Sequence, residues 1–316
     1  MEYRLFCFRR EFFPTYSKIE LFNDDRFYKE HKERWKTYPQ SFVPWIFRRK
    51  ISIRNLKTST LQFKRLHTEV KLDKLQSLRL IQNNDISGIE DIYLLCSNLQ
   101  SFTISESSSN LTSEKYMYHL SKLTNLRSLK LQVSHVISDV DIRFLSMGCR
   151  LLENLDLFLF TKITVRTIKH LAKNCRQLKS LYLTNCFKKF EYSCLKEVTE
   201  FCHFPKDAGF PMLTDLDLSS SHLQDVWLTF PVTRHYYPSL TSLNLDRCIG
   251  LKDSSLAELS SHCPMLKILY LRRFVFMDNG LEYISGCREL QELYLQDCLH
   301  LPLWANQNPH HNSGEL

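Results

Sequence analysis

Residues 263–271 read Cys-Pro-Met-Leu-Lys-Ile-Leu-Tyr-Leu, and the spacing of their three leucines recurs along the chain. The pattern Leu-x-x-Leu-x-Leu, or a close variant, occurs nine times at intervals of 24 to 27 residues, with one interval of 35. The copies begin at Leu75, Leu99, Leu126, Leu152, Leu178, Leu213, Leu240, Leu266 and Leu290. Repetition at such a period is typical of a solenoid, in which each unit buries its apolar face by stacking on its neighbours.

Each copy predicts a short strand, because its last two leucines are two residues apart and therefore point to the same side. Between copies, segments such as 137–142, 163–168, 251–256 and 276–281 place apolar residues at helical spacing. Asp139, Asp253 and Asp278 are the candidate N-caps of these helices. The sequence thus predicts an α/β leucine-rich-repeat solenoid, a horseshoe of about nine strand-turn-helix repeats, over residues 71–300.

The charge of the chain is uneven. Residues 1–70 hold 16 of the 42 Lys and Arg residues and 8 of the 34 Asp and Glu residues, so the rest of the chain is neutral. Arg48-Arg49-Lys50 is the only basic triplet in this segment, and a continuous phosphate-binding stripe is not indicated. We therefore do not expect nucleic-acid binding. No apolar run approaches the ~18 residues of a membrane span, and we expect a cytoplasmic or nuclear protein without a membrane partner.

The 11 cysteines form no Cys-x-x-Cys pair and instead recur at two fixed phases of the repeat. One set stands three residues before the first leucine of a copy and comprises Cys96, Cys149, Cys175, Cys263 and Cys287. The other set stands three residues after the last leucine and comprises Cys186, Cys248 and Cys298. A free cysteine is small and a weak hydrogen-bond donor, which suits crowded positions where carbonyl groups need partners. We expect buried, structural thiols.

These cysteine phases, with Cys263-Pro-Met-Leu266 after an expected helix, resemble the cysteine-containing repeats of F-box/LRR proteins over roughly residues 72–300. In that family the F-box binds a Skp-type adaptor of a cullin-RING ubiquitin ligase, and the repeats hold the protein to be ubiquitinated. The resemblance implies a non-enzymatic substrate receptor of an SCF-type ligase, with a protein target on the concave face of the repeats. The alternative is an LRR scaffold or assembly factor without a ligase, similar to a mitochondrial ATP synthase factor.

The N-terminal residues 1–70 match the F-box pattern only at its end. Arg34-Trp35 and Trp45 have the family's spacing, whereas the opening Leu-Pro is missing. Trp35 and Trp45 are therefore the candidate adaptor-facing residues. Three interpretations remain open: a divergent F-box, a truncated one, or a segment that caps the apolar end of the first repeat. We expect the last residues, 301–316, to be a disordered tail.

The face of the sheet opposite the leucines is the expected binding surface. It displays the residue before the second leucine of each copy, the residue between the last two, and the residue after them. In the later copies these positions carry carboxylates and aromatic rings, which would steer and anchor a protein with a basic segment. The predicted partner-binding residues are Asp156, Phe158, Tyr182, Asp215, Asp217, Asp246, Tyr270, Arg272 and Tyr294.

The chain shows no pattern typical of catalysis or of cofactor binding. Its 7 glycines form neither Gly-x-Gly-x-x-Gly nor a P-loop, so no nucleotide cofactor is expected. His203 follows Cys202 and His262 precedes Cys263, but neighbouring residues point in different directions and do not make a Cys/His dyad. His310-His311 lacks the further ligands of a zinc site. We expect neither enzymatic activity nor a metal.

Overall fold

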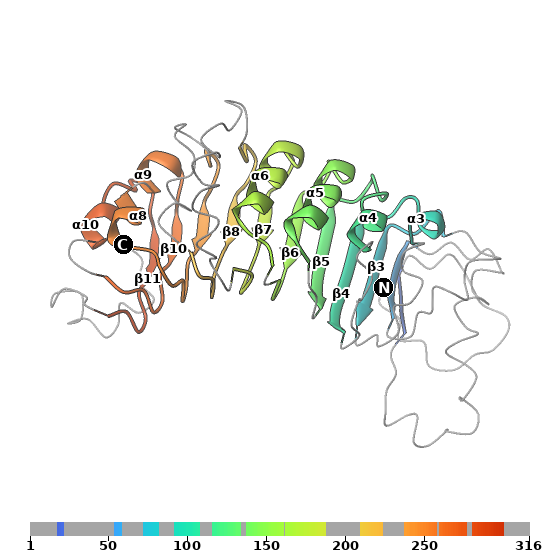
Figure 1. Ribbon diagram of the computed structural model, residues 1–316, viewed down its shortest axis with the longest axis horizontal. Helices are drawn as coiled ribbons and strands as arrows, with labels where there is room; N and C mark the ends of the chain where they lie inside the picture. The colour runs from blue at the N-terminus through green and yellow to red at the C-terminus, as the bar shows by residue number, and fades with distance from the viewer. Residues whose placement is uncertain are drawn as a thin grey trace, which may run out of the picture. The chain divides into compact units, whose positions relative to one another are not determined.

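The computed structural model describes part of the chain (Figure 1). The described residues are 18–21, 54–58, 72–81, 92–107, 116–133, 137–160, 162–187, 209–223, 237–257, 259–276 and 280–299. The chain divides into two compact units. Unit 1 comprises Met1–His135 and Met147–Leu151, and unit 2 comprises Val136–Ser146 and Leu152–Leu316.

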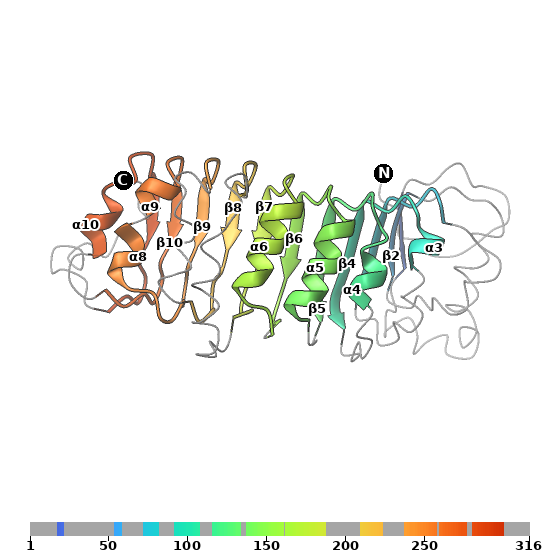
Figure 2. The same cartoon turned by 45° about the horizontal axis from the view of Figure 1, so that its top comes forward.

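Unit 1 contains five strands that pair in parallel and in sequence order. The strands are β1 (Lys18–Leu21), β2 (Asn55–Thr58), β3 (Ser77–Ile81), β4 (Ser101–Ser107) and β5 (Ser128–Val133). Helix α3 (Ile92–Leu95) follows β3, and helix α4 (Tyr116–Leu120) follows β4. Both helices lie on the same face of the strands (Figure 2). The other face carries the side chains that alternate with the core residues.

Unit 2 continues the pattern with six strands, again parallel and in sequence order. They are β6 (Asn154–Leu157), β7 (Ser180–Tyr182), β8 (Asp215–Asp217), β9 (Ser242–Asn244), β10 (Ile268–Tyr270) and β11 (Glu292–Tyr294). The helices are α5 (Asp139–Gly148), α6 (Val165–Asn174), α8 (Asp253–Ala257), α9 (Leu259–His262) and α10 (Gly280–Ile284). The boundary between the units falls within the sequence of α5.

The leucine pattern decides both where the strands lie and which side is buried. Each strand from β3 to β11 begins at the residue before the second leucine of a copy. Within β3, Leu78 and Leu80 are fully buried while Arg79 between them is exposed. Apolar helix residues such as Ile142 of α5 and Leu171 of α6 are buried as well. The predicted leucine-rich-repeat fold with nine strands is therefore confirmed.

The sheet also extends into the N-terminal segment. Strands β1 and β2 lie within residues 1–70; β1 pairs in parallel with β2, and β2 pairs with β3. The sequence pattern did not reveal them because neither carries the full leucine triplet. The predicted domain limits at residues 70 and 300 stay predictions, and residues 301–316 lie outside the described residues.

The cysteines connect successive repeats through carbonyl groups. Cys186, Cys248 and Cys298 donate from Sγ to the carbonyl oxygens of Leu157, Leu218 and Leu271, one repeat earlier, over 3.0 to 3.2 Å. In the other set, the Cys149 thiol lies 3.4 Å from the Leu120 and Leu123 carbonyls, and that of Cys175 lies 3.8 Å from the Ser146 carbonyl. These contacts occupy carbonyls at the ends of strands and helices, as the two phases predicted.

A turn with a left-handed residue follows every strand of unit 2. Leu159, Asn185, Ser220, Arg247, Arg273 and Asp297 have φ between 55° and 67°. Each stands two residues after the last leucine of its copy. The N–H of Arg247, for example, donates to the Arg272 carbonyl of the next repeat at 2.8 Å. The inter-repeat hydrogen bonds thus continue past the strand ends, which offsets the backbone strain of a left-handed non-glycine residue.

The predicted N-cap role of Asp139 and Asp253 is wrong, because both are the first residues of their helices. In α5, the N–H and Oγ of Ser138 instead donate to the Asp141 carboxylate at 2.8 and 2.6 Å, as in a capping box. The Asp139 carboxylate faces the following repeat and accepts hydrogen bonds from Thr164 and Thr167 at the start of α6. Asp278, the third predicted N-cap, lies outside the described residues.

Candidate functional site

Six residues line up across unit 2 on the face opposite the leucines. The pairing register places Asp156, Tyr182, Asp217, Asn244, Tyr270 and Tyr294 next to one another, one from each strand from β6 to β11. Adjacent strands are ~4.8 Å apart, so side chains of neighbouring strands are within reach of each other. We call this set the central row. Five of its six members are predicted partner-binding residues, and Asn244 is the addition.

The aromatic members of the central row differ in their surroundings. The rings of Tyr270 and Tyr294 stack with their centroids 4.5 Å apart and an interplanar angle of 11°. The Tyr294 hydroxyl donates to Glu292 Oε2 at 2.7 Å, and this hydrogen bond is the main reason why the pKa of Tyr294 is raised. Tyr182 is 36% exposed. The rings of Tyr270 and Tyr294 are therefore held by each other and by Glu292, whereas the Tyr182 ring is exposed to solvent.

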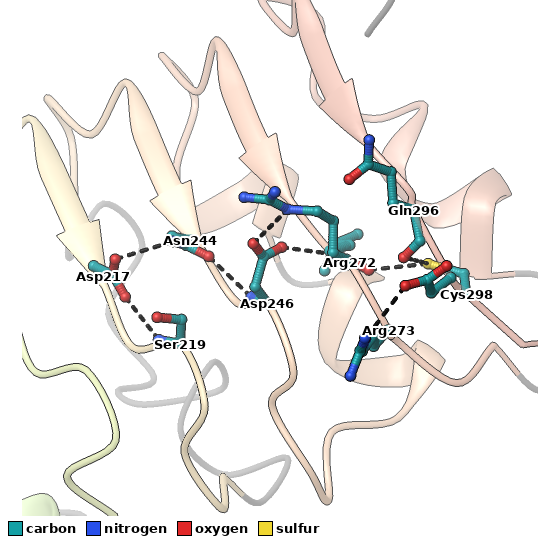
Figure 3. A network of polar contacts seen from close by, with 10 residues as sticks. Asp217, Ser219, Asn244, Asp246, Arg272, Arg273, Gln296 and Cys298 are labelled. Carbon is teal, nitrogen blue, oxygen red and sulfur yellow. Dashed lines mark hydrogen bonds and ion pairs between the residues drawn. The ribbon is translucent and has the colours of Figure 1, made fainter. Parts of the chain in front are cut away.

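Hydrogen bonds through Asn244 of β9 connect the Asp217 carboxylate of β8 to Asp246 in the turn after β9 (Figure 3). Asp217 accepts from the Ser219 N–H at 2.8 Å and from Asn244 Nδ2 at 3.0 Å. Asn244 Oδ1 in turn accepts from the Asp246 N–H at 3.0 Å. Asn244 thus orients the Asp217 carboxylate and also holds the turn that carries Asp246. Sequence reasoning placed Asn244 on this face but singled out only charged and aromatic residues.

Asp246 and Arg272 form an internal ion pair. Asp246 accepts from the backbone N–H and from Nε of Arg272, both at 2.7 Å. Asp246 is 8% exposed, whereas the Arg272 side chain is 43% exposed. The Arg272 guanidinium also lies over the Tyr270 ring, with 5.8 Å from Cζ to the ring centroid. The charge of Asp246 is therefore balanced within the protein by Arg272, whereas Asp215 and Asp217 of β8 accept hydrogen bonds from uncharged groups.

The remaining predicted residues have simpler surroundings. Asp215, two residues before Asp217 in β8, accepts from Thr214 Oγ1 at 2.6 Å and is half-buried. Asp156 and Phe158 are also half-buried. Trp35 and Trp45, the candidate adaptor-facing residues, lie outside the described residues. The structure thus brings the unit 2 predictions together on one face and gives no position for the two tryptophans.

The described thiols have the properties of structural residues. Eight cysteines are free, and seven of them are buried. Burial raises the pKa of the Cys96, Cys186, Cys248 and Cys263 thiols to about 12. A thiol needs a lowered pKa to act as a nucleophile at neutral pH, and these four have the opposite shift. Among the residues that the structure describes, no cluster of three or more His, Cys, Asp or Glu suits a metal ion, and no helix is long and apolar enough to cross a membrane.

Comparison with known proteins agrees with the repeat class. No protein-family model matches the chain. Over 149 residues it is 30% identical to F-box/LRR-repeat protein 4 from Bos taurus, which covers 47% of the chain and 22% of that protein. The predicted resemblance to F-box/LRR proteins is confirmed. Because the chain spans about a fifth of the length of this relative, an F-box in residues 1–70 stays a prediction.

Solved structures with similar architecture include an internalin, InlF, from Listeria monocytogenes. It has a TM-score of 0.48 at 15% identity, covering 83% of the chain and 77% of the internalin. Yeast Rad7, solved in complex with Elc1, has a TM-score of 0.46 at 18% identity, covering 88% of the chain and 71% of the matched one. At these scores neither similarity bears on the partners of the chain.

Proposed function

We propose that the chain is the target-recognition part of an SCF-type ubiquitin ligase and holds its target on the open face of unit 2. The proposal rests on one observation above all: the central row places two carboxylates, one asparagine and three tyrosines in register on six adjacent strands. The likeness to an F-box/LRR-repeat protein supports the ligase context. Recognition by such a surface requires positioning of the target and no chemistry by the chain itself.

The chemistry of the face favours a target with a basic segment. Asp215 and Asp217 supply negative charge on β8. Tyr182 of β7 lies between Asp217 and Asp156 of β6 in the pairing register. A tyrosine provides a large contact area and attracts the cationic heads of Lys and Arg through its ring. The chain itself contains an example of this recognition. The Arg272 guanidinium pairs with the Asp246 carboxylate and lies over the Tyr270 ring.

The ligase half of the proposal concerns residues 1–70. We propose that Trp35 and Trp45 belong to an F-box-like segment that contacts a Skp-type adaptor, which in turn binds a cullin. We further propose that the protein acts in the cytoplasm or nucleus, because the eight free thiols at repeat phases suit a reducing compartment.

Copurification tests this assignment. The full chain, tagged at its C-terminus, is purified from cells and blotted for the Skp-type adaptor and the cullin. We expect both to be recovered with the wild-type chain and lost with the variant Trp35→Ala/Trp45→Ala, while Trp304→Ala near the C-terminus serves as the control. If neither protein is recovered with the wild-type chain, the ligase assignment is wrong, and a scaffold or assembly factor that uses the same face is the remaining function.

A further inference from the structure

One arrangement on the open face of unit 2 already holds a cation. Arg272 Nε donates to Asp246 Oδ2 at 2.7 Å (Figure 3), and the Arg272 guanidinium lies over the Tyr270 ring. A carboxylate and a tyrosine ring from neighbouring strands therefore hold a guanidinium in this protein. Arg272 is the one cationic side chain at the open-face positions from β6 to β11, all of which the structure describes. The face thus has no second cation of its own at these positions.

Tyr182 and its neighbours on β8 repeat this combination of groups. Tyr182 of β7 and Asp217 of β8 are register partners, so the two strands place them about 4.8 Å apart. Asp215 stands two residues earlier on β8 and projects from the same face. Tyr182 is 36% exposed, and neither aspartate forms an ion pair with a described residue. The position two residues after the tyrosine, which is an arginine in the later repeat, is Thr184.

Uncharged donors orient both carboxylates. Asp217 Oδ1 accepts from the Ser219 N–H at 2.8 Å, and its Oδ2 accepts from Asn244 Nδ2 at 3.0 Å. Asp215 Oδ2 accepts from Thr214 Oγ1 at 2.6 Å. A carboxylate has about four acceptor sites, so each keeps sites for further donors. Because both groups are already oriented, the binding of a cation requires little reorganisation.

From these contacts we infer that the target is recognised through an arginine, whose guanidinium stacks on the Tyr182 ring and donates to Asp215 and Asp217. The inference rests on the proposed function in one respect, because it takes the open face of unit 2 as the surface that binds the target. It adds the kind of side chain that is recognised and the three residues that recognise it. We call Tyr182, Asp215 and Asp217 the arginine seat.

The shape of the arginine seat favours arginine over lysine. A guanidinium is planar and has five N–H donors, so its face can rest on a ring while its edge donates to carboxylates. An ammonium group is a compact, strongly hydrated point charge and does not stack. Asp215 and Asp217 are two residues apart on one strand, which corresponds to about 7 Å. Both carboxylates are therefore within reach of the edge of one guanidinium.

Binding of defined peptides to the full chain tests the inference. The probes are the blocked peptide Gly-Ser-Arg-Ser-Gly and three copies whose central residue is lysine, citrulline or glutamate. Citrulline keeps the planar shape of arginine and removes its charge. Saturation-transfer NMR detects the weak binding that one side chain provides. We expect the arginine peptide to bind at least about fivefold more tightly than the lysine peptide and about tenfold more tightly than the other two.

Variants locate the binding. Asp217→Asn removes one charge at constant shape and should weaken the arginine peptide by about fivefold or more. Tyr182→Leu removes the ring and should bring the arginine and lysine peptides to within about twofold of each other, whereas Tyr182→Phe should retain the preference for arginine. Glu289→Gln changes the net charge equally at an exposed position outside the open face and should leave the affinity within about twofold. Circular dichroism verifies that each variant is folded.

Four results would overturn the inference. The first is no detectable binding of the arginine peptide at about 10 mM. The second is equal affinity of the wild-type chain for the arginine and lysine peptides, which would mean that charge alone is recognised. The third is an equal effect of Asp217→Asn and Glu289→Gln, which would mean that only net charge matters. The fourth is an unchanged preference for arginine in Tyr182→Leu, which would place the arginine elsewhere.

The inference and the proposed function fail separately. Copurification with the adaptor and the cullin depends on Trp35 and Trp45, and no peptide result alters it. Loss of that copurification would in turn leave the arginine preference of the open face unchanged. Equal binding of the arginine and lysine peptides would refute the arginine seat and leave the open face as a surface for a basic segment.

Discussion

The carboxylate of Asp139 connects two repeats, and its removal should destabilise unit 2 measurably. It accepts four hydrogen bonds: from the N–H and Oγ1 of Thr164 at 2.8 and 2.6 Å, and from the N–H and Oγ1 of Thr167 at 3.1 and 2.7 Å. Thr167 is fully buried. The carboxylate also lies at the N-terminus of α6, where the helix dipole favours negative charge.

Two substitutions separate these contributions. Asp139→Ala leaves the Thr164 and Thr167 donors without their acceptor, and a buried donor without a partner costs about 1–3 kcal/mol. Adding the lost helix-dipole interaction of ~0.5 kcal/mol, we expect a loss of about 3 kcal/mol in the free energy of unfolding. Asp139→Asn keeps an amide oxygen as acceptor and removes only the charge, so we expect a loss of ~1 kcal/mol.

Urea unfolding followed by circular dichroism measures both variants against Asp297→Ala. Asp297 forms an exposed ion pair with Arg273 at 3.3 Å, and such a pair contributes less than ~1 kcal/mol. Hydrogen exchange of the Thr167 amide gives a local readout and should be faster in Asp139→Ala. The inter-repeat role of Asp139 would be refuted if Asp139→Ala were as stable as Asp297→Ala, or if the exchange of that amide were unchanged.

Three further predictions follow from the geometry of unit 2. Arg272→Met leaves the nearly buried Asp246 carboxylate without its ion-pair partner and should lower the free energy of unfolding by about 1–2 kcal/mol. Adding Asp246→Asn to this variant should reduce the loss. An equal loss in the single and the double variant would contradict the pairing. Glu292→Gln weakens the hydrogen bond that raises the pKa of Tyr294, so the ultraviolet titration of this tyrosine should shift to lower pH. Because the pKa of Tyr294 is raised in the folded chain, the stabilisation by this contact is present at neutral pH and is lost as the pH rises through the folded pKa. The buried thiols, with pKa values raised by burial, should react with iodoacetamide far more slowly in the native chain than after unfolding, as mapped by mass spectrometry; rapid native alkylation of any of the eight described cysteines would contradict their structural role.

The sequence predicted the repeat fold because a single physical requirement determines it. Buried leucines must alternate with exposed residues along every strand, and that requirement is legible as Leu-x-x-Leu-x-Leu. The cysteine phases were legible for the same reason, since a small donor must stand where carbonyls lack partners. The leucine pattern did not predict strands β1 and β2, because pairing to a neighbouring strand stabilises them without the complete motif.

The site was predictable only as far as single side chains are concerned. Alternation placed Asp217 and Tyr270 on the open face, but it carries no information about contacts between repeats. The neutralisation of Asp246 by Arg272 depends on a turn in which both backbone and side chain of the arginine face one carboxylate. The misassigned Asp139 has the same origin, because a capping residue and a residue that contacts the next repeat look alike in sequence.

The open face of unit 1 illustrates a third limit. Its cationic residues are separated by 22 residues between Lys57 and Arg79 and by 51 between Arg79 and Lys130, so no local pattern reveals that they share a row. Strand pairing places them in one row with Thr103.

The central claim is that the open face of unit 2 holds the protein's target, and partner capture by surface variants tests it most directly. Proteins recovered with the tagged wild-type chain are compared by quantitative mass spectrometry with those recovered by Tyr182→Ala/Asp215→Lys and by the control Asp73→Lys, which alters an exposed turn. Our account predicts that a set of partners with basic segments is lost from the first variant and retained by the control. Retention of every partner by Tyr182→Ala/Asp215→Lys, in a chain that is folded by circular dichroism, would contradict it.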